Sequence, residues 1–316
     1  MLNKIANLAL ITALIVIMLG AWVRLTDAGL GCPDWPGCYG QILVPDTSNE
    51  IDGFENFLED RPFDEGAAWR EMIHRYLASF LGLLSLLILY FSWKEKKSIK
   101  LGVILVTVIL FQGMLGMLTV TWLLKPVIVM GHLLGGMTTL SILYLIRRQS
   151  APREISNRNL VNLSWVALIA AILQLALGGW VSANYAAIAC PDFPTCQNQW
   201  WPENLDFQQG FDAWHGIGID YEGGILDNAA RTAIHFTHRL GAIFVGLVLF
   251  VFGLRLRKKQ ETYLLGSTIL AAVSLQISIG ISVVVFGYPL NLAVMHNGMG
   301  ALLLLTVVEA KRKITT

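Results

Sequence analysis

Four of the six histidines in this chain of 316 residues repeat at a fixed spacing. His74 and His132 are 58 positions apart (132 − 74), and so are His238 and His296 (296 − 238). Ionisable side chains inside apolar segments are costly and usually functional. Two imidazoles that face each other across a helical bundle can bind a haem iron from both sides of the porphyrin. The pattern therefore favours bis-histidine haem ligation in each half of the chain.

Two alternatives compete with haem ligation. A zinc site is disfavoured, because neither half supplies a third ligand at a matching position. A lone histidine near a membrane interface can also be an anchor or a satisfied core group, but four at matched spacing argue against that. Glycines beside the histidines, in "GHLLGG" (131–136) and "HNGMG" (296–300), would let a flat macrocycle approach the backbone, although small residues also serve ordinary helix packing.

Charged or titratable side chains accompany the first histidine of each pair. Glu71 precedes His74 by three positions, so the two side chains share one face of a helix. A carboxylate there could relay protons or stabilise a developing cation, or it could simply favour a helix N-terminus. Its counterpart in the second half is His235 (71 + 164). Arg75 and Arg239 directly follow paired histidines and are candidates for haem propionate contacts or for interface anchors.

All four cysteines lie in two similar loops, "LGCPDWPGC" (30–38) and "IACPDFPTC" (188–196). Five residues separate Cys32 from Cys38 and Cys190 from Cys196, and two prolines in each loop favour a turn that brings the sulfurs together. We expect a local structural disulfide in each loop. Redox exchange with a partner is the alternative.

The composition is that of a membrane protein. Hydrophobic residues make up 55% of the chain, charged residues make up 14%, and the mean hydropathy is +0.58. The net charge of +1 gives no indication of a nucleic-acid partner. A hydrocarbon core needs about 20 apolar residues per helix, and eight stretches qualify: 6–23, 73–93, 101–122, 127–146, 161–181, 235–254, 263–286 and 290–308. The sequence Trp22-Val23-Arg24 replaces the small-residue cleavage site of a signal peptide, so we expect the first stretch to be a span.

Basic residues predict the orientation in the membrane. The segments "WKEKKSIK" (93–100), "RRQSAPREISNR" (147–158), "RLRKKQ" (255–260) and "KRK" (311–313) all fall on one side, which we expect to be cytoplasmic together with both termini. The long connections 25–72 and 182–233 face outward, and the first carries the acidic segment "EIDGFENFLEDRPFDE" (50–65). Both cysteine loops then lie on the outer face of the cell membrane, where disulfides persist.

The motifs are parts of a whole-chain repeat. "LGAWV" (19–23) and the first cysteine loop recur 158 positions later, whereas "IHRYLASFLGLL" (73–84), Gln112 and Gly116 recur 164 positions later. A longer second outer connection absorbs the six extra residues (164 − 158). We therefore predict an all-α integral membrane protein of eight transmembrane helices, built as two tandem four-helix bundles over residues 1–150 and 151–316.

These features together resemble the haem A synthase family. The resemblance covers nearly the whole chain: eight spans, tandem halves, a paired-cysteine loop in each half, Glu-x-x-His-Arg at Glu71 to Arg75, the His238-Arg239 pair, and single histidines at 132 and 296. It implies oxidation of a haem O methyl group to a formyl group by successive hydroxylations, for haem-copper oxidases. For the residues of this chain, the resemblance implies that His74 and His132 face the substrate haem O and that Glu71 is important for turnover. It also implies that His238 and His296 ligate a resident haem b. The resemblance gives no role to His235 or His215, and His215 is expected to be exposed.

The resemblance also implies partners. A haem O synthase, which is a farnesyltransferase, would supply the substrate, and an electron donor or acceptor would be external because the chain has no dinucleotide fingerprint. A homo-oligomer is left open. The alternatives in function are a bis-histidine dihaem electron carrier of the cytochrome b type, a haem transporter, and a structural membrane subunit. The Glu71 and His235 asymmetry favours division of labour between the halves.

Overall fold

The computed structural model describes residues 1–46, 62–149, 151, 155–156 and 158–315. Within these residues, eight helices are long and apolar enough to cross a membrane, which confirms the predicted all-helical, multi-pass membrane fold. They are α1 (Leu2–Leu25), α3 (Glu65–Lys94), α4 (Ile99–Thr121), α5 (Pro126–Arg147), α6 (Arg158–Ala183), α8 (Asn228–Arg257), α9 (Tyr263–Val285) and α10 (Leu290–Lys313). The short helix α7 (Phe207–Gly210) lies between α6 and α8, and two-residue strands β1 (Ile155–Ser156) and β2 (Ile314–Thr315) pair in parallel.

Two helices begin well before the predicted spans. Helix α3 starts eight residues early (73 − 65) and α8 seven residues early (235 − 228), so the long connections are shorter than predicted. An aspartate caps each start: Asp64 accepts the Ala67 N–H at 3.0 Å, and Asp227 accepts the Ala230 N–H at 2.9 Å. Hydropathy detects only the apolar part of a helix, so polar first turns escape it. His74 therefore lies in the third turn of α3 rather than just inside its start.

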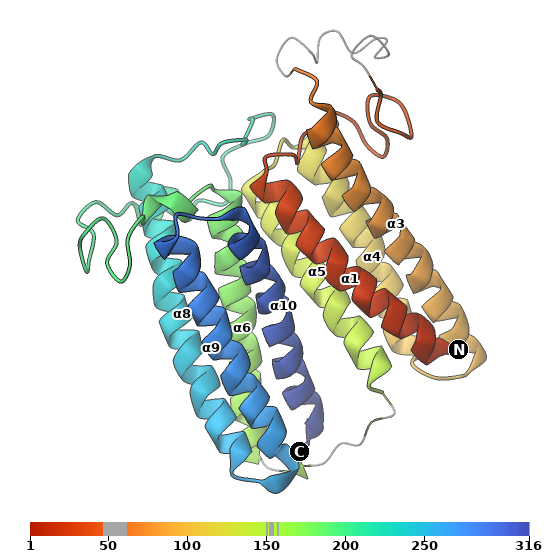
Figure 1. The fold of residues 1–316 in the computed structure, drawn as a ribbon. Helices are drawn as coiled ribbons and strands as arrows, with labels where there is room; N and C mark the ends of the chain where they lie inside the picture. The colour runs from red at the N-terminus through yellow and green to blue at the C-terminus, as the bar shows by residue number, and fades with distance from the viewer. Residues whose placement is uncertain (47–61, 150, 152–154, 157, 316) are drawn as a thin grey trace.

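The helices pack in two groups of four with the same neighbour order (Figure 1). Helix α1 contacts α3 and α5, and α4 contacts both of these; likewise α6 contacts α8 and α10, and α9 contacts both of these. The groups meet through α1 with α10 and through α5 with α6. Parallel repeats related by a pseudo-two-fold axis along the bundle have this exchange of equivalent neighbours. The assignment of residues 1–150 and 151–316 to separate functions stays a prediction.

Contacts across the two groups join equivalent positions of the repeat. At the end of the bundle that carries the cysteine loops, the Arg24 guanidinium donates to the Ser182 carbonyl at 2.6 Å, and the Tyr185 hydroxyl donates to Asp27 at 3.0 Å. Both pairs are 158 positions apart (182 − 24; 185 − 27), which is the repeat offset in this region. The Arg24 guanidinium also lies 3.9 Å from the ring centroid of Tyr185.

At the opposite end, one buried carboxylate joins the two groups. Glu309 on α10 accepts from Arg148 at 2.8 Å and from Arg312 at 2.7 Å. These two arginines are repeat equivalents (312 − 148 = 164). Arg312 also donates to the Ala151 carbonyl at 3.0 Å, beyond the end of α5. The carboxylate thereby ties α10 to the end of α5.

Both termini lie at the end of the bundle away from the cysteine loops (Figure 1). The described residues of the basic segments at the ends of α3, α5, α8 and α10 lie at this terminal end as well. This is the geometry that the orientation prediction requires, while the side of the membrane stays a prediction. Residues 50–61 of the acidic segment are outside the described residues.

Replacing Glu309 with alanine should lower the free energy of unfolding by about 2 kcal/mol, because it leaves two guanidinium groups without their carboxylate. Thermal unfolding in detergent measures the change. Glu95→Ala is the control, since Glu95 pairs with the Met1 amine in a largely exposed contact at the same end and exposed pairs contribute little to stability. Equal losses in the two variants would contradict a special role for Glu309.

Candidate functional site

The first histidine pair lies close together, edge to face, inside the first group of helices. His74 on α3 and His132 on α5 have ring centroids 6.5 Å apart, with their planes at 78°. A metal ion that bonds two opposed imidazoles at about 2 Å leaves the ring centres roughly 6 Å apart. The structure therefore brings the two predicted histidines together at a spacing that suits one shared iron, and ligation itself stays a prediction. His238 and His296 hold the equivalent positions on α8 and α10.

Each of the four imidazoles lies against a glycine of a neighbouring helix. A Cβ atom at Gly20 would be 2.9 Å from Cε1 of His74, and one at Gly116 would be 3.4 Å from Cε1 of His132. Gly178 and Gly280 are the repeat equivalents, and a Cβ there would be 3.2 Å from His238 and 2.8 Å from His296. Larger side chains would push the rings aside, so these glycines set the ring positions.

Two of the glycines that the sequence singled out beside the histidines lie in contacts between helices. A Cβ at Gly135 would be within 2.7 Å of the Gln112 carboxamide, and one at Gly298 would be 3.2 Å from the sulfur of Met18. Close packing of helices is thus observed at these glycines, and approach of a macrocycle stays a prediction.

The residues of the first pair fit a haem. Nδ1 of His74 and Nδ1 of His132 are both buried and have no side-chain hydrogen-bond partner among the described residues. Buried polar atoms in proteins rarely lack a hydrogen-bond partner, so each atom that lacks one calls for an explanation. Opposed imidazoles with space set by glycine, in an apolar bundle, match the donor set of a bis-histidine haem.

Glu71 is buried and bonded to the first cysteine loop. Its side chain is 5% exposed, one carboxylate oxygen accepts the Cys32 N–H at 2.9 Å, and the other accepts from Arg75 at 2.5 Å. The carboxylate is therefore fixed on the same helix face as His74, one turn nearer the cysteine loop. In the second group His235 occupies this position, and its Nε2 lies 3.4 Å from Nε of Arg239.

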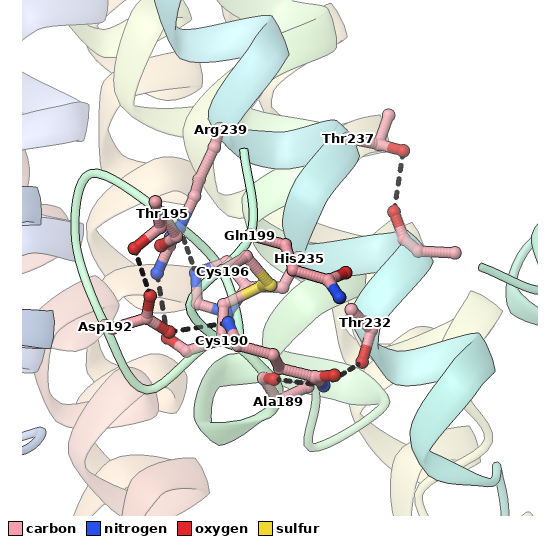
Figure 2. The surroundings of a disulfide bond; sticks show 12 residues. Ala189, Cys190, Asp192, Thr195, Cys196, Gln199, Thr232, His235, Thr237 and Arg239 are labelled. Atoms are coloured by element: carbon pink, nitrogen blue, oxygen red, sulfur yellow. Dashed lines mark hydrogen bonds between the residues drawn. A yellow bond between two sulfur atoms is a disulfide. The ribbon is translucent and has the colours of Figure 1, made fainter. Parts of the chain in front are cut away.

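Both predicted propionate-binding arginines bind the cysteine loops. Arg75 donates to the Asp34 carbonyl at 2.9 Å and to the Gly37 carbonyl. Arg239 donates to the carbonyls of Thr195 at 2.7 Å and Cys190 at 2.8 Å (Figure 2). A propionate contact stays a prediction for either arginine, whereas the loop contacts give each a structural role that the sequence did not show.

The cysteine loops contain the expected local disulfides, Cys32–Cys38 and Cys190–Cys196. All four cysteines are at most 1% exposed, so a partner thiol cannot reach the sulfurs without movement of the loop, which favours the structural role over exchange.

One aspartate closes each loop. Asp192 accepts the N–H groups of Gln197 at 2.6 Å and Asn198 at 3.0 Å, together with the Thr195 hydroxyl. Asp34 accepts the equivalent N–H groups of Tyr39 and Gly40 at 2.6 and 2.8 Å. Figure 2 shows Asp192 turned into the loop and Arg239 reaching the loop from α8.

A family model described as cytochrome oxidase assembly protein, COX15-CtaA, matches residues 3–308. The chain belongs to this family. A relative from Shewanella oneidensis named "Heme A synthase" is 44% identical over 313 residues, which cover 97% of this chain and 94% of the relative. Proteins of the same name from Halalkalibacterium halodurans and Mesorhizobium japonicum are 24% and 25% identical, over 97% and 92% of this chain and 94% and 84% of their own lengths.

This COX15-CtaA member also has a contact between its halves that the sequence did not indicate. Residues 211–224 reach the turn between α4 and α5, where the Lys125 ammonium donates to the Gly216 carbonyl at 2.6 Å and lies 3.1 Å from the Trp214 ring centroid. The Tyr221 N–H donates to the Leu123 carbonyl at 3.1 Å. Burial lowers the pKa of Lys125, which is 1% exposed. His215 is in this segment and is only 20% exposed in its side chain, so the prediction of an exposed histidine was wrong.

Replacing Asp192 with alanine in this family member should cost about 1 kcal/mol of stability at pH 7, the usual loss when a capping side chain is removed. Partial burial raises the pKa of Asp192, but the bonds from Thr195 and the loop N–H groups outweigh it and hold that pKa below its usual value. The contribution is therefore full at neutral pH and is lost as the pH falls through the folded-state pKa. Thermal unfolding from pH 7 to pH 3 should show the variant and the parent converging. A difference that grows towards acid would contradict this.

Replacing Arg239 with leucine should make the Cys190–Cys196 disulfide roughly tenfold faster to reduce, because two charged hydrogen bonds to the loop are lost. Thiol alkylation after timed exposure to a water-soluble phosphine measures the rate. Arg231→Leu is the control, since Arg231 donates to Leu226 outside the loop. An unchanged rate together with a lower haem content would instead favour the propionate role.

Proposed function

We propose that this chain is a haem A synthase, which oxidises a methyl group of haem O to a formyl group by successive hydroxylations. The observation that carries the proposal is the opposed pair of His74 and His132 with a buried carboxylate one turn away on the same helix. The names of its relatives support the same activity.

The first group of helices would bind the substrate. His74 and His132 hold haem O between them, within residues 1–150, and the glycines at 20 and 116 keep their rings in place. His238 and His296 hold a resident haem b within residues 151–316. Haem supplies one-electron redox chemistry when bound, which amino-acid side chains do not provide. The four histidines orient the two macrocycles.

Glu71 would relay a proton, or stabilise the developing positive charge, at the reacting methyl group. A general acid or base must be held within reach of the atom that it serves. The Cys32 N–H and Arg75 hold this carboxylate in one position, so the first cysteine loop takes part in placing the catalytic group. His235 replaces the carboxylate in the second half, which suits a site that transfers electrons only.

The remaining assignments concern placement and partners. The termini and the basic segments face the cytoplasm, and the cysteine loops face outward from the cell membrane. A farnesyltransferase that makes haem O supplies the substrate, an external carrier exchanges electrons, and a haem-copper oxidase receives the product.

Glu71→Gln tests the function. The amide keeps the size and one acceptor for the Cys32 N–H, so we expect haem binding to persist while haem A formation falls by at least about a hundredfold. The variant and the parent are purified from cells with and without a haem O synthase, and their extracted haems are separated by chromatography. Glu65→Gln, at an exposed position in the first turn of α3, should behave like the parent.

Two outcomes would count against the proposal. Normal haem A formation by Glu71→Gln would remove Glu71 from the reaction. Two unmodified b haems in every parent sample would instead indicate a dihaem electron carrier.

A further inference from the structure

A groove of about 760 Å³ lies between the two groups of helices, towards the end of the bundle that holds the termini. Its walls come from α5 of the first group and from α6 and α10 of the second, three helices that contact one another (Figure 1). The lining is mostly apolar and includes Leu145, Leu168 and Leu304. Sites that bind small molecules typically have volumes of about 300 to 1,000 Å³. The groove is therefore large enough to hold a ligand.

The groove is separate from the candidate haem site. Successive residues of an α-helix are turned by about 100°. Leu134 and Ser141 line the groove two and nine positions after His132 (134 − 132; 141 − 132). They are therefore turned by about 200° and 180° from that histidine, on the opposite face of α5. His132 faces α4 instead, where Gly116 lies against its ring.

The length of the groove matches one leaflet of a bilayer. From Leu134 to Leu145 the lining covers eleven steps of α5 (145 − 134), which is about 16 Å at 1.5 Å per residue. Half of a hydrocarbon core is about 15 Å thick. Trp165, which also lines the groove, is half-exposed in the second turn of α6. Tryptophan is enriched where the hydrocarbon meets the headgroups, so the groove has the position and depth of a lipid chain.

A cation lies at the end of the groove nearest the termini. The Lys311 ammonium on α10 is 4.5 Å from the ring centroid of Trp165. Among the described residues it has no carboxylate partner. Glu309, two positions earlier, is already bonded to Arg148 and Arg312. The positive charge of Lys311 is therefore available to an anion beside the apolar lining, which is the arrangement that anionic lipids recognise.

The equivalent place in the other half has a different pair of residues. The repeat counterparts of Lys311 and Trp165 are Arg147 (311 − 164) and Asn7 (165 − 158). The Arg147 guanidinium donates to the Asn7 carboxamide oxygen at 2.5 Å, so it already has a polar partner. Arg147 thus provides a matched charge at the same end of the bundle, on a residue that does not line the groove.

We propose that this groove is a binding site for an anionic phospholipid. An acyl chain lies between α5, α6 and α10, and the phosphate lies at the Lys311 ammonium beside Trp165. Inorganic phosphate would leave the apolar length of the groove uncovered, and a second copy of the chain would need a carboxylate to face Lys311. The lipid contacts both groups of helices and so joins them at the seam between α5 and α6. The site goes beyond the proposed function and does not depend on it.

The test is lipid binding to the purified holoprotein, measured by native mass spectrometry in detergent. The protein is titrated with phosphatidylglycerol or with phosphatidylcholine that carries the same acyl chains. We expect the parent to bind its first phosphatidylglycerol more tightly than its first phosphatidylcholine. Lys311→Gln should weaken the phosphatidylglycerol complex about fivefold, the usual contribution of one cation near a lipid surface, and leave phosphatidylcholine unchanged. Arg147→Gln, the matched control, should bind both lipids as the parent does.

A second variant tests the apolar part of the site. Thr138 is exposed and lines the groove, so Thr138→Phe should narrow it and weaken the binding of both lipids. Equal affinity of the parent for the two lipids would overturn the inference, and so would unchanged phosphatidylglycerol binding by a Lys311→Gln variant that unfolds at the temperature of the parent. Dimers of the parent that bind no lipid would overturn it in favour of a second copy of the chain in the groove.

Discussion

A bilayer offers no water to a buried polar group, so each such group within the spans must find its partner inside the protein. This constraint organises the molecule. Glu71 is satisfied by a loop N–H and an arginine, Glu309 by two arginines, and the arginines after the paired histidines by loop carbonyls. The exceptions are then informative. The buried ring atoms without a side-chain partner in the described structure include Nδ1 of His74 and Nδ1 of His132, at the site where the substrate is proposed to bind.

The same rule accounts for the cysteine loops. A short loop with two prolines has few backbone N–H groups to pair with its carbonyls. Arg75 on α3 and Arg239 on α8 donate hydrogen bonds to these carbonyls. Because Arg75 also bonds Glu71, the first loop, its disulfide and the candidate catalytic carboxylate form one connected network. In the second half the network ends at His235, which carries no fixed negative charge.

Much of this could be predicted from the sequence, for identifiable reasons. Length and hydropathy give eight spans because hydrocarbon thickness sets a minimum apolar run, but they miss the polar first turns that Asp64 and Asp227 cap. The repeat finds the histidine pairs and the glycines at 20 and 178, because both halves keep them. It cannot find the contact of Lys125 with residues 211–224, since that contact joins residues outside the repeated motifs. Nor could spacing show that Arg75 and Arg239 point at loop carbonyls, because the direction of a long side chain depends on how the loop folds back.

The segment 211–224 has a consequence for how the protein is made. It comes from the second half, yet it supplies the carbonyl that accepts from Lys125 and the indole that covers this ammonium group at the end of the first half. Because α1 to α5 are synthesised before this segment, the contacts of Lys125 can form only after residues 211–224 have been made. Duplication of an ancestral unit gave each copy its own helices, but the first copy now completes its assembly only when the second arrives. The two halves are equivalent in their helices, but the contacts of Lys125 in the first half depend on a segment of the second.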